Sequence, residues 1–243
     1  MKLNYLSINH LSEKKLSLPE PDTMDICIFS LADFPSIADS KHILSAKEQE
    51  KSSSLRQETD RICFTASRIL LRRLLGLYLD FPAECLLFKT GPHGKPGLFF
   101  EENKDALPKI RFNLSHSGGY IALAFSAFFP VGIDIENIRE NARIEPLVRR
   151  FFHPDEYKAF LKLDPSARQD FFFRRWTVRE AFLKGIGTGL TMSPDSFCVE
   201  EISGSSPLFH IEKGQEDYSS WQIMPVPAAD GYYCSAAYQL PGR

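Results

Sequence analysis

Two acidic residues alternate with aliphatic ones in segment 131–136, which reads Val-Gly-Ile-Asp-Ile-Glu. Successive side chains of a β-strand point to opposite faces, so Asp134 and Glu136 share one face, within about 7 Å of each other, while the aliphatic side chains face the core. Such a like-charge pair favours a nearby cation, and a hard divalent cation prefers oxygen ligands. The pair predicts a metal site, and a strand with a solvated polar face is the alternative interpretation.

A second acidic residue pattern lies in segment 176–185, Trp-Thr-Val-Arg-Glu-Ala-Phe-Leu-Lys-Gly, which we predict to be helical. Glu180 and Lys184 are four residues apart and therefore share a helix face, with Trp176 one turn before them. In isolation this pair would be a routine surface salt bridge. Trp176 and Ala181 indicate a packed helix instead, in which a glutamate at the buried edge requires a partner such as a cation.

Two polar turns could bind phosphate groups. Residues 112–118 read Phe-Asn-Leu-Ser-His-Ser-Gly, and the turn predicted from Ser115 onward offers a hydroxyl, an imidazole and backbone amides. A Ser/His nucleophile pair is disfavoured, because Ser115 and His116 are adjacent and point to opposite sides of an extended chain, and no G-x-S-x-G elbow surrounds them. The turn 91–96, Gly-Pro-His-Gly-Lys-Pro, presents Lys95 as a point charge for a phosphate or as a solvated side chain.

Along the rest of the chain, apolar residues recur with a period of two in some segments and of 3.6 in others. This mixture of strand and helix patterns predicts an α+β fold. Strands are predicted at 24–31, 86–89, 111–114, 120–126, 131–136, 197–199, 208–211, 221–224 and 232–238. Helices are predicted from a capping box at Ser45 and Glu48, over 61–79, and in the region 144–185, with a start near 154–156 and a long segment at 166–184. We expect two halves, 1–128 and 129–243, with a ligand cleft between them.

Composition excludes several functional classes. The 243 residues include 29 basic and 31 acidic side chains, for a net charge of −2, so a general nucleic-acid or membrane-surface binder is not expected. The 5 cysteines form no C-x-x-C pair and predict buried free thiols. The apolar stretches are shorter than the roughly 18–20 residues of a membrane helix, and the first residues lack a signal-peptide pattern. We therefore expect a cytoplasmic protein.

In this order and spacing, the segments resemble the Sfp-type 4′-phosphopantetheinyl transferase family. Its pattern is a G-K-P turn, then N-x-S-H-S-G, G-[IV]-D-[IV]-E and W-[TS]-x-K-E-A-x-x-K; here these motifs correspond to residues 94–96, 113–118, 132–136 and 176–184, and residues 151–156 resemble the F-[ST]-x-x-E motif of the family. One departure is Arg179, which stands where the pattern has lysine. Because arginine and lysine differ in donor geometry, Arg179 could alter phosphate or carrier contacts.

The resemblance implies two similar α+β halves related by a pseudo-two-fold axis, with the active site between them. It implies transfer of 4′-phosphopantetheine from coenzyme A to a serine of an apo acyl or peptidyl carrier protein, with release of adenosine 3′,5′-bisphosphate. It also implies Mg²⁺ as cofactor, with Mn²⁺ able to take its place. Carried over by motif, the metal ligands are Asp134, Glu136 and Glu180; the catalytic residues are Glu180 and Lys184; and the phosphate contacts are Lys95, Ser115, His116 and Lys184. Lys51, Arg61 and His93 are further expected contacts of coenzyme A, although the basic residues before the G-K-P turn align poorly with the family pattern.

Some questions stay open in the sequence. Lys51, Arg56 and Arg61 are alternative partners for the nucleotide end of coenzyme A. The carrier could serve fatty-acid, polyketide, nonribosomal-peptide or siderophore synthesis. The basic, Phe-rich region 149–173 is a candidate docking surface for an acidic carrier, or a set of core aromatics beside solvated charges. A monomer fits the chain length. A coenzyme A- or carrier-binding protein without catalysis, and a hydrolase or phosphotransferase for another pyrophosphate ester, are alternative functions.

Overall fold

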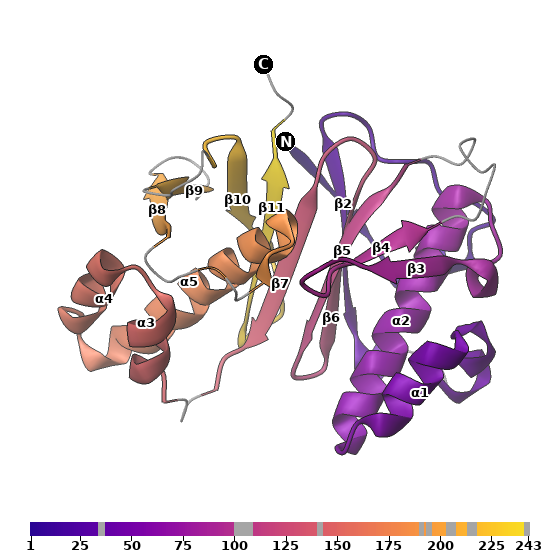
Figure 1. Cartoon of the computed structure of the whole chain (residues 1–243), viewed down its shortest axis with the longest axis horizontal. Coiled ribbons are helices and arrows are strands. Elements are labelled where there is room, and N and C mark those ends of the chain that lie inside the picture. Colours follow the sequence, from indigo (N-terminus) through magenta and orange to yellow (C-terminus); the bar gives the residue numbers. More distant parts are fainter. Residues whose placement is uncertain are drawn as a thin grey trace. The chain divides into compact units, whose positions relative to one another are not determined.

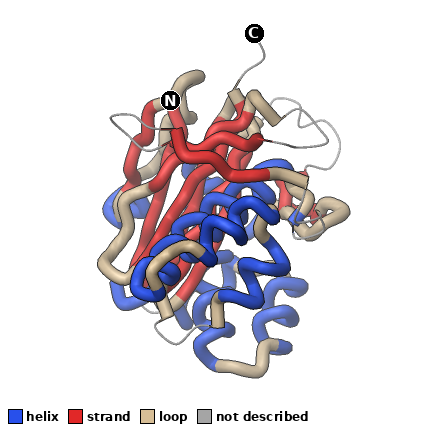
Figure 2. The backbone as a smooth tube through the Cα atoms, turned by 90° about the vertical axis from the view of Figure 1, so that its left-hand side faces the viewer, coloured by secondary structure: helices blue, strands red, loops and turns tan. Residues whose placement is uncertain are grey.

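The computed structural model describes residues 1–33, 37–99, 109–139, 143–189, 192, 196–202, 208–212 and 218–240. The chain divides into two compact units, one of Met1–Gly91 with Pro96–Phe128 and one of Pro92–Lys95 with Phe129–Arg243. Each unit combines helices with a sheet, and helices and strands make up most of the described chain (Figures 1 and 2). The predicted α+β class is confirmed, while a pseudo-two-fold relation between halves stays a prediction.

The sheet of the first unit has the strand order β1-β2-β6-β5. β1 (Lys2–Leu6) pairs in parallel with β2 (Thr23–Ser30), whereas β6 (Tyr120–Ser126) runs antiparallel to both β2 and β5 (Arg111–Ser117). The sequence did not predict β1, because only Leu6 of its five residues is buried and no apolar alternation marks it. A strand held mainly by backbone pairing leaves little side-chain signal.

Helix α2 (Glu58–Leu79) covers this sheet (Figure 1), and its leucines share the core of the first unit with Phe125 of β6. The helix begins three residues before the predicted start, where Glu58 and Asp60 suit the positive N-terminal end of a helix. It ends at Leu79 and is followed by Asp80, whose φ of 52° lies in the left-handed region.

The predicted capping box begins α1 (Ala46–Ser54): the Ser45 side chain accepts from the Glu48 amide, and the Glu48 carboxylate accepts from the Ser45 amide at 2.9 Å. The same carboxylate lies 2.7 Å from a guanidinium nitrogen of buried Arg72, which ties α1 to α2. The remaining elements of this unit are a two-stranded sheet of β3 (Leu87–Thr90) and β4 (Pro96–Phe99), and 3-10 turns at Ile8–Ser12, Leu31–Asp33, Ile37–Ile43 and Ala83–Cys85.

The second unit contains an antiparallel sheet with the order β7-β11-β10-β9-β8. Its strands are β7 (Val131–Asn137), β8 (Cys198–Ile202), β9 (Leu208–Glu212), β10 (Trp221–Pro225) and β11 (Tyr232–Gln239), and its helices are α3 (Glu145–Phe151), α4 (Pro154–Leu161) and α5 (Pro165–Ile186). The predicted helical region 144–185 comprises these three helices, and the predicted start near 154–156 and the predicted long segment 166–184 correspond to α4 and α5. Pro154 and Pro165 stand at the first position of α4 and α5, where proline suits a helix start.

Helix α5 packs directly against β7 and β11 (Figure 1). Its buried residues Val178, Ala181 and Phe182 share a core with Trp221 and Ile223 of β10. No helix in the described part of the chain is long and apolar enough to cross a bilayer. All five cysteines are free, and Cys85 is exposed, contrary to the expectation that the thiols are buried.

Gly132 sets how closely α5 approaches β7. A Cβ atom on Gly132 would overlap the Ala181 carbonyl oxygen and lie 2.5 Å from the Gly185 amide nitrogen. Both obstacles are backbone atoms of α5, so no side-chain rotation could make room. Only glycine permits this contact, which brings the next residues of β7 against the helix.

We predict that Gly132→Ala lowers the free energy of unfolding by about 3 kcal/mol or more, since overpacking against backbone forces α5 away from β7. Urea unfolding followed by circular dichroism measures the change. Gly97→Ala is the matched control, because a Cβ on Gly97 meets nothing within 4 Å. Equal stability of the two variants would contradict the close contact.

Candidate active site

The carboxylates of β7 lie on the strand face that meets α5. Asp134 is only 2 % exposed, and Glu136, two residues further, is half-buried. Val131, Ile133 and Ile135 on the other face are fully buried as well. The interpretation of β7 as a strand with a solvated polar face is therefore wrong for Asp134, which is buried under α5.

Helix α5 supplies the opposing charge. The ammonium of Lys184 lies 2.6 Å from one carboxylate oxygen of Asp134. Glu180, one turn before Lys184, has a carboxylate oxygen (Oε1) that is buried and has no hydrogen-bond partner among the described residues. The predicted pair on one helix face is thus directed at β7, where Lys184 forms an ion pair with Asp134.

The electrostatic environment raises the pKa of Glu180 from its ordinary value of 4.5 to about 7. Burial is the largest cause, and the negative charge of Asp134 adds to it; Lys184 opposes the shift, and Glu136 contributes a smaller increase. Asp134 and Glu136 therefore disfavour a charged Glu180, and Lys184 only partly offsets their effect on its pKa. A bound cation would relieve this repulsion.

The donor set fits a hard cation such as Mg²⁺, because it consists of carboxylate oxygens and includes one buried oxygen without a partner. Within the described ranges, however, no three His, Cys, Asp or Glu side chains are gathered closely enough to hold a metal ion. Asp134, Glu136 and Glu180 are the residues that would hold it. Their convergence at ligand distances stays a prediction.

Lys95 lies at the C-terminal end of α5. Its ammonium donates to the Gly185 carbonyl at 2.7 Å and to the Val131 carbonyl at 3.1 Å. A cation is favoured there by the negative end of the helix dipole. This contact brings Lys95 to the same end of the helix as Lys184, whereas His93, in the turn before it, is exposed. Contacts of Lys95 and His93 with phosphate stay predictions.

Ser115 and His116 lie in β5 of the first unit, not in a turn. The prediction of a polar turn from Ser115 onward is wrong, because β5 continues to Ser117 and pairs in register with β6. The turn consists of Gly118 and Gly119 alone, and the φ of 60° at Gly118 suits glycine at the first position of a two-residue hairpin. As expected for adjacent strand residues, the side chains diverge: Ser115 is 6 % exposed and His116 is exposed.

The basic residues proposed for the nucleotide end of coenzyme A differ in their surroundings. Lys51 is exposed on α1, and Arg56 is exposed after it. Arg61, in the first turn of α2, donates to the carbonyls of Leu55 and Arg56 at 3.0 and 3.1 Å. Arg61 also lines a surface pocket of about 520 Å³ within the first unit, together with Lys41, Ser52, Ser53, Glu58, Ile62 and Thr65. Lys51 and Arg56 do not line this pocket.

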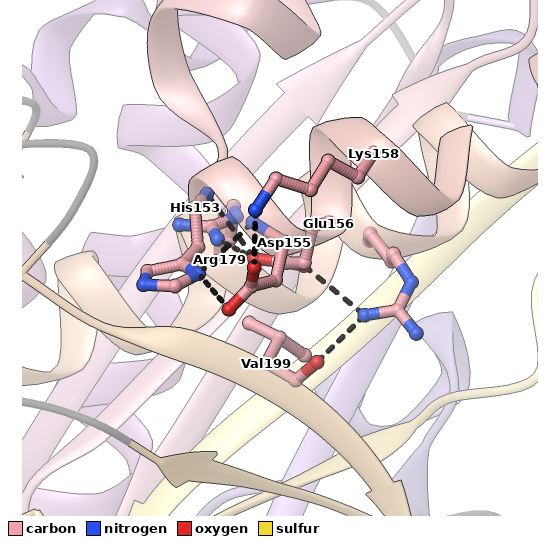
Figure 3. Close-up of polar contacts among 7 residues, drawn as sticks. His153, Asp155, Glu156, Lys158, Arg179 and Val199 are labelled. Atoms are coloured by element: carbon pink, nitrogen blue, oxygen red, sulfur yellow. Dashed lines mark hydrogen bonds and ion pairs between the residues drawn. The ribbon is translucent and has the colours of Figure 1, made fainter. Parts of the chain in front are cut away.

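Sequence reasoning missed the role of Arg179. Its side chain is 3 % exposed and forms an ion pair with Glu156 of α4 (Figure 3). Its guanidinium is buried against α4, and an effect of Arg179 on phosphate or carrier contacts stays a prediction. Glu156 lies in the motif at 151–156 and Arg179 in the motif at 176–184. The opposite charges of these two motif residues were the signal in the sequence that could have indicated an ion pair.

The Phe-rich region 149–173 combines buried aromatic side chains with many exposed residues. The phenylalanines at 152, 160, 172 and 173 form a buried cluster, against which Trp176 packs. Arg149 and Arg150 of α3 are exposed and, together with Glu145 and Pro146, line a surface pocket of about 480 Å³. For the aromatic side chains, the interpretation as core residues is the right one.

Comparison with known proteins gives the family. The chain is 35 % identical over 199 residues to the 4′-phosphopantetheinyl transferase HetI of a Nostoc species, which covers 82 % of this chain and 79 % of HetI. The chain belongs to the 4′-phosphopantetheinyl transferase superfamily. Residues 130–237 match the model of that superfamily, and residues 35–127 match the model of the 4′-phosphopantetheinyl transferase N-terminal region.

Other relatives of this superfamily agree. The chain is 30 % identical to the 4′-phosphopantetheinyl transferase Sfp of Bacillus subtilis over 64 % of this chain and 66 % of Sfp. It is 28 % identical to the L-aminoadipate-semialdehyde dehydrogenase-phosphopantetheinyl transferase of Rattus norvegicus, over 82 % of this chain and 68 % of that protein. The predicted family and the predicted phosphopantetheinyl transferase activity are confirmed.

The raised pKa of Glu180 predicts a pH-dependent stability of the metal-free protein. The unfolded chain releases this proton near pH 4.5 and the folded chain near pH 7, so the folded protein binds more protons between these values and loses stability as the pH rises. We predict that Glu180→Gln, which removes this titration, becomes more stable than the wild type above pH 7, by up to roughly 3 kcal/mol.

Urea unfolding in EDTA at a series of pH values measures this difference. Glu145→Gln on α3 is the control for the same substitution at an exposed position. If the difference in free energy of unfolding between the wild type and Glu180→Gln is constant across the same pH range, the pKa of Glu180 is not raised in the folded protein.

Proposed function

We propose that the chain transfers the 4′-phosphopantetheine group of coenzyme A to a serine of an apo acyl or peptidyl carrier protein, with Mg²⁺ as cofactor. The observation that carries this proposal is the Lys184–Asp134 ion pair beside the half-buried Glu180, whose Oε1 atom is buried. These residues lie on β7 and α5, within the segment that matches the superfamily model. HetI and Sfp carry the same activity in their names.

The reaction forms one phosphorus–oxygen bond and breaks another. The serine hydroxyl of the carrier attacks the β-phosphorus of coenzyme A, and the bond from that phosphorus to the bridging oxygen breaks. Adenosine 3′,5′-bisphosphate leaves with the bridging oxygen and its electron pair. Because such a transfer requires mainly positioning and charge neutralisation, the protein groups needed are cations and a base.

Glu180 is the proposed base, which takes the serine proton directly or through one water molecule. Its Oε1 atom has no hydrogen-bond partner among the described residues, and a carboxyl with a pKa of about 7 accepts a proton more readily than an ordinary one. A neighbouring cation lowers this pKa and keeps the carboxylate ionised but less basic. The role of Glu180 therefore depends on how its two oxygens are shared between ligand and base.

Lys184 and Lys95 are the proposed phosphate contacts at the end of α5. Lys184 neutralises Asp134 and can exchange that carboxylate for a phosphate oxygen, because its side chain is only partly buried. Asp134, Glu136 and Glu180 would hold Mg²⁺, or Mn²⁺ in its place, which when bound neutralises charge on the pyrophosphate. Lys51, Arg61, His93, Ser115 and His116 stay proposed contacts of coenzyme A.

We predict that the purified protein, incubated with coenzyme A and Mg²⁺, adds one phosphopantetheine to at least one member of a panel of apo carrier proteins. Intact mass spectrometry measures the gain, and EDTA should abolish it until Mg²⁺ or Mn²⁺ is restored. Modification that persists in EDTA would contradict the metal dependence. Coenzyme A binding without any gain in mass across acyl and peptidyl carriers would favour a binding protein.

We predict that Asp134→Asn lowers the transfer rate by at least roughly 100-fold, because it removes a carboxylate that would bind the metal and leaves Lys184 without its ion-pair partner. The same mass assay, run as a time course, measures the rate. Asp155→Asn on α4 is the control, since Asp155 is an exposed carboxylate of equal size. Near-normal turnover of a folded Asp134→Asn protein would remove Asp134 from the site.

A further inference from the structure

One carboxylate of α4 holds two arginines of α5. An oxygen (Oε2) of Glu156 pairs with Arg179 (Figure 3). The other oxygen (Oε1) lies 3.1 Å from a guanidinium nitrogen of Arg175, one turn earlier in the helix. Arg175 also donates to the Val199 carbonyl of β8 at 2.6 Å. Because Glu156 is only 4 % exposed, each of its oxygens exchanges water for a guanidinium. This cluster joins α4 and β8 to one side of α5.

Two aromatic rings complete the surroundings of Arg179. Its guanidinium carbon lies 4.8 Å from the centre of the Phe152 ring and 4.5 Å from the centre of the Phe197 ring. Phe152 precedes α4 and Phe197 precedes β8, so both belong to the segments that Glu156 and Val199 anchor. A planar guanidinium offers a wide, weakly hydrated face to such rings, whereas an ammonium is compact and strongly hydrated. The slot matches the shape of arginine.

Two further contacts fix α5 on its other sides. Gly132 of β7 meets the helix backbone at Ala181, and the Thr177 hydroxyl lies 3.0 Å from the Ser235 hydroxyl of β11. Consecutive helix residues point about 100° apart, so the direction of Arg179 determines the direction of Glu180. A rotation of α5 about its axis, or a shift along it, would move Glu180 and Lys184 away from Asp134.

We propose that Arg179 is a positioning residue for Glu180 and Lys184, and that its slot requires a guanidinium even though the family pattern has lysine at this position. The Glu156–Arg179 pair and the two rings hold the rotation of α5 that directs Glu180 and Lys184 toward β7. The kinetic part of this inference rests on the proposed function; the part concerning the position of α5 does not.

The alternative is that Arg179 only stabilises the fold and does not position Glu180 and Lys184, and the test must distinguish these two roles. Breaking a buried ion pair destabilises a protein whether or not the pair positions a site, so a lower melting temperature alone decides nothing. The test therefore compares folded proteins well below their melting temperatures. Its readouts are Mn²⁺ affinity by calorimetry, and kcat and KM for coenzyme A with a carrier that the wild type modifies.

Arg179→Lys is the informative variant, because it keeps the charge and restores the residue of the family pattern. Arg174→Lys is the matched control: Arg174 lies on the same helix, pairs with Glu201 at 2.6 Å and lies over the Phe209 ring, but it is partly exposed. Glu156→Gln supplies a second test if Arg179→Lys does not fold, since the amide keeps the shape of the carboxylate and removes its charge.

We expect Arg179→Lys and Glu156→Gln to bind Mn²⁺ roughly 10- to 100-fold more weakly than the wild type, the range typical of groups that orient metal ligands. We expect kcat to fall by a similar factor while KM for coenzyme A changes little, and Arg174→Lys to match the wild type. Folded Arg179→Lys protein with wild-type Mn²⁺ affinity and kcat would overturn the inference.

Failure of the proposed function would be visible separately. If the wild type modifies no carrier, the Mn²⁺ affinities still test whether Arg179 positions the carboxylates. If the wild type binds no Mn²⁺, the metal assignment fails. Crystal structures of the wild type and Arg179→Lys then test whether Arg179 positions Glu180 and Lys184. The inference then expects the Lys184–Asp134 ion pair to be lost in the variant, and an unchanged ion pair overturns it.

Discussion

The contact between the backbones of β7 and α5 at Gly132 is the constraint on which the candidate site depends. It leaves no layer of side chains between strand and helix, so the next residue on the same strand face, Asp134, is buried directly under α5. A carboxylate in that place needs a cation, and the helix supplies Lys184. The close contact thus converts an ordinary sheet–helix interface into a place where charge must be matched at short range.

The positive charge of Lys184 does not offset the negative charges of both Asp134 and Glu180, and this explains the chemistry of the site. The Lys184 ammonium faces Asp134, while Glu180 is half-buried nearby, with a buried oxygen that lacks a partner among the described residues and a pKa raised to about 7. A core selected for stability alone would favour apolar side chains here, since buried charges rarely add stability. An excess of carboxylate in a packed region is better explained by a function, because a bound divalent cation and a phosphate ligand would together restore the balance.

The sequence predicted the parts of this site that follow from periodicity. Alternation in β7 predicted that Asp134 and Glu136 share one face of the strand, and helical spacing predicted that Glu180 and Lys184 share one face of a helix. The burial of Asp134 could not be predicted, because it follows from the approach of α5 at Gly132, a tertiary contact. The end of β5 was misplaced because Ser115 and His116 have the composition of a turn, whereas their pairing with β6 keeps them extended. Strand β1 was missed because its side chains are mostly exposed.

Arg179 and Glu180 show why adjacent residues of one motif can serve different purposes. The helix directs the first toward α4 and β8, where Glu156 and two rings enclose it, and the second toward the carboxylates of β7. Charge alone would make arginine and lysine equivalent at position 179. The two rings make them different, because a planar, weakly hydrated guanidinium suits contact with aromatic rings better than a compact, strongly hydrated ammonium. A departure from a family pattern can therefore be a local adaptation of packing, with its consequence for the site transmitted through the rotation of a single helix.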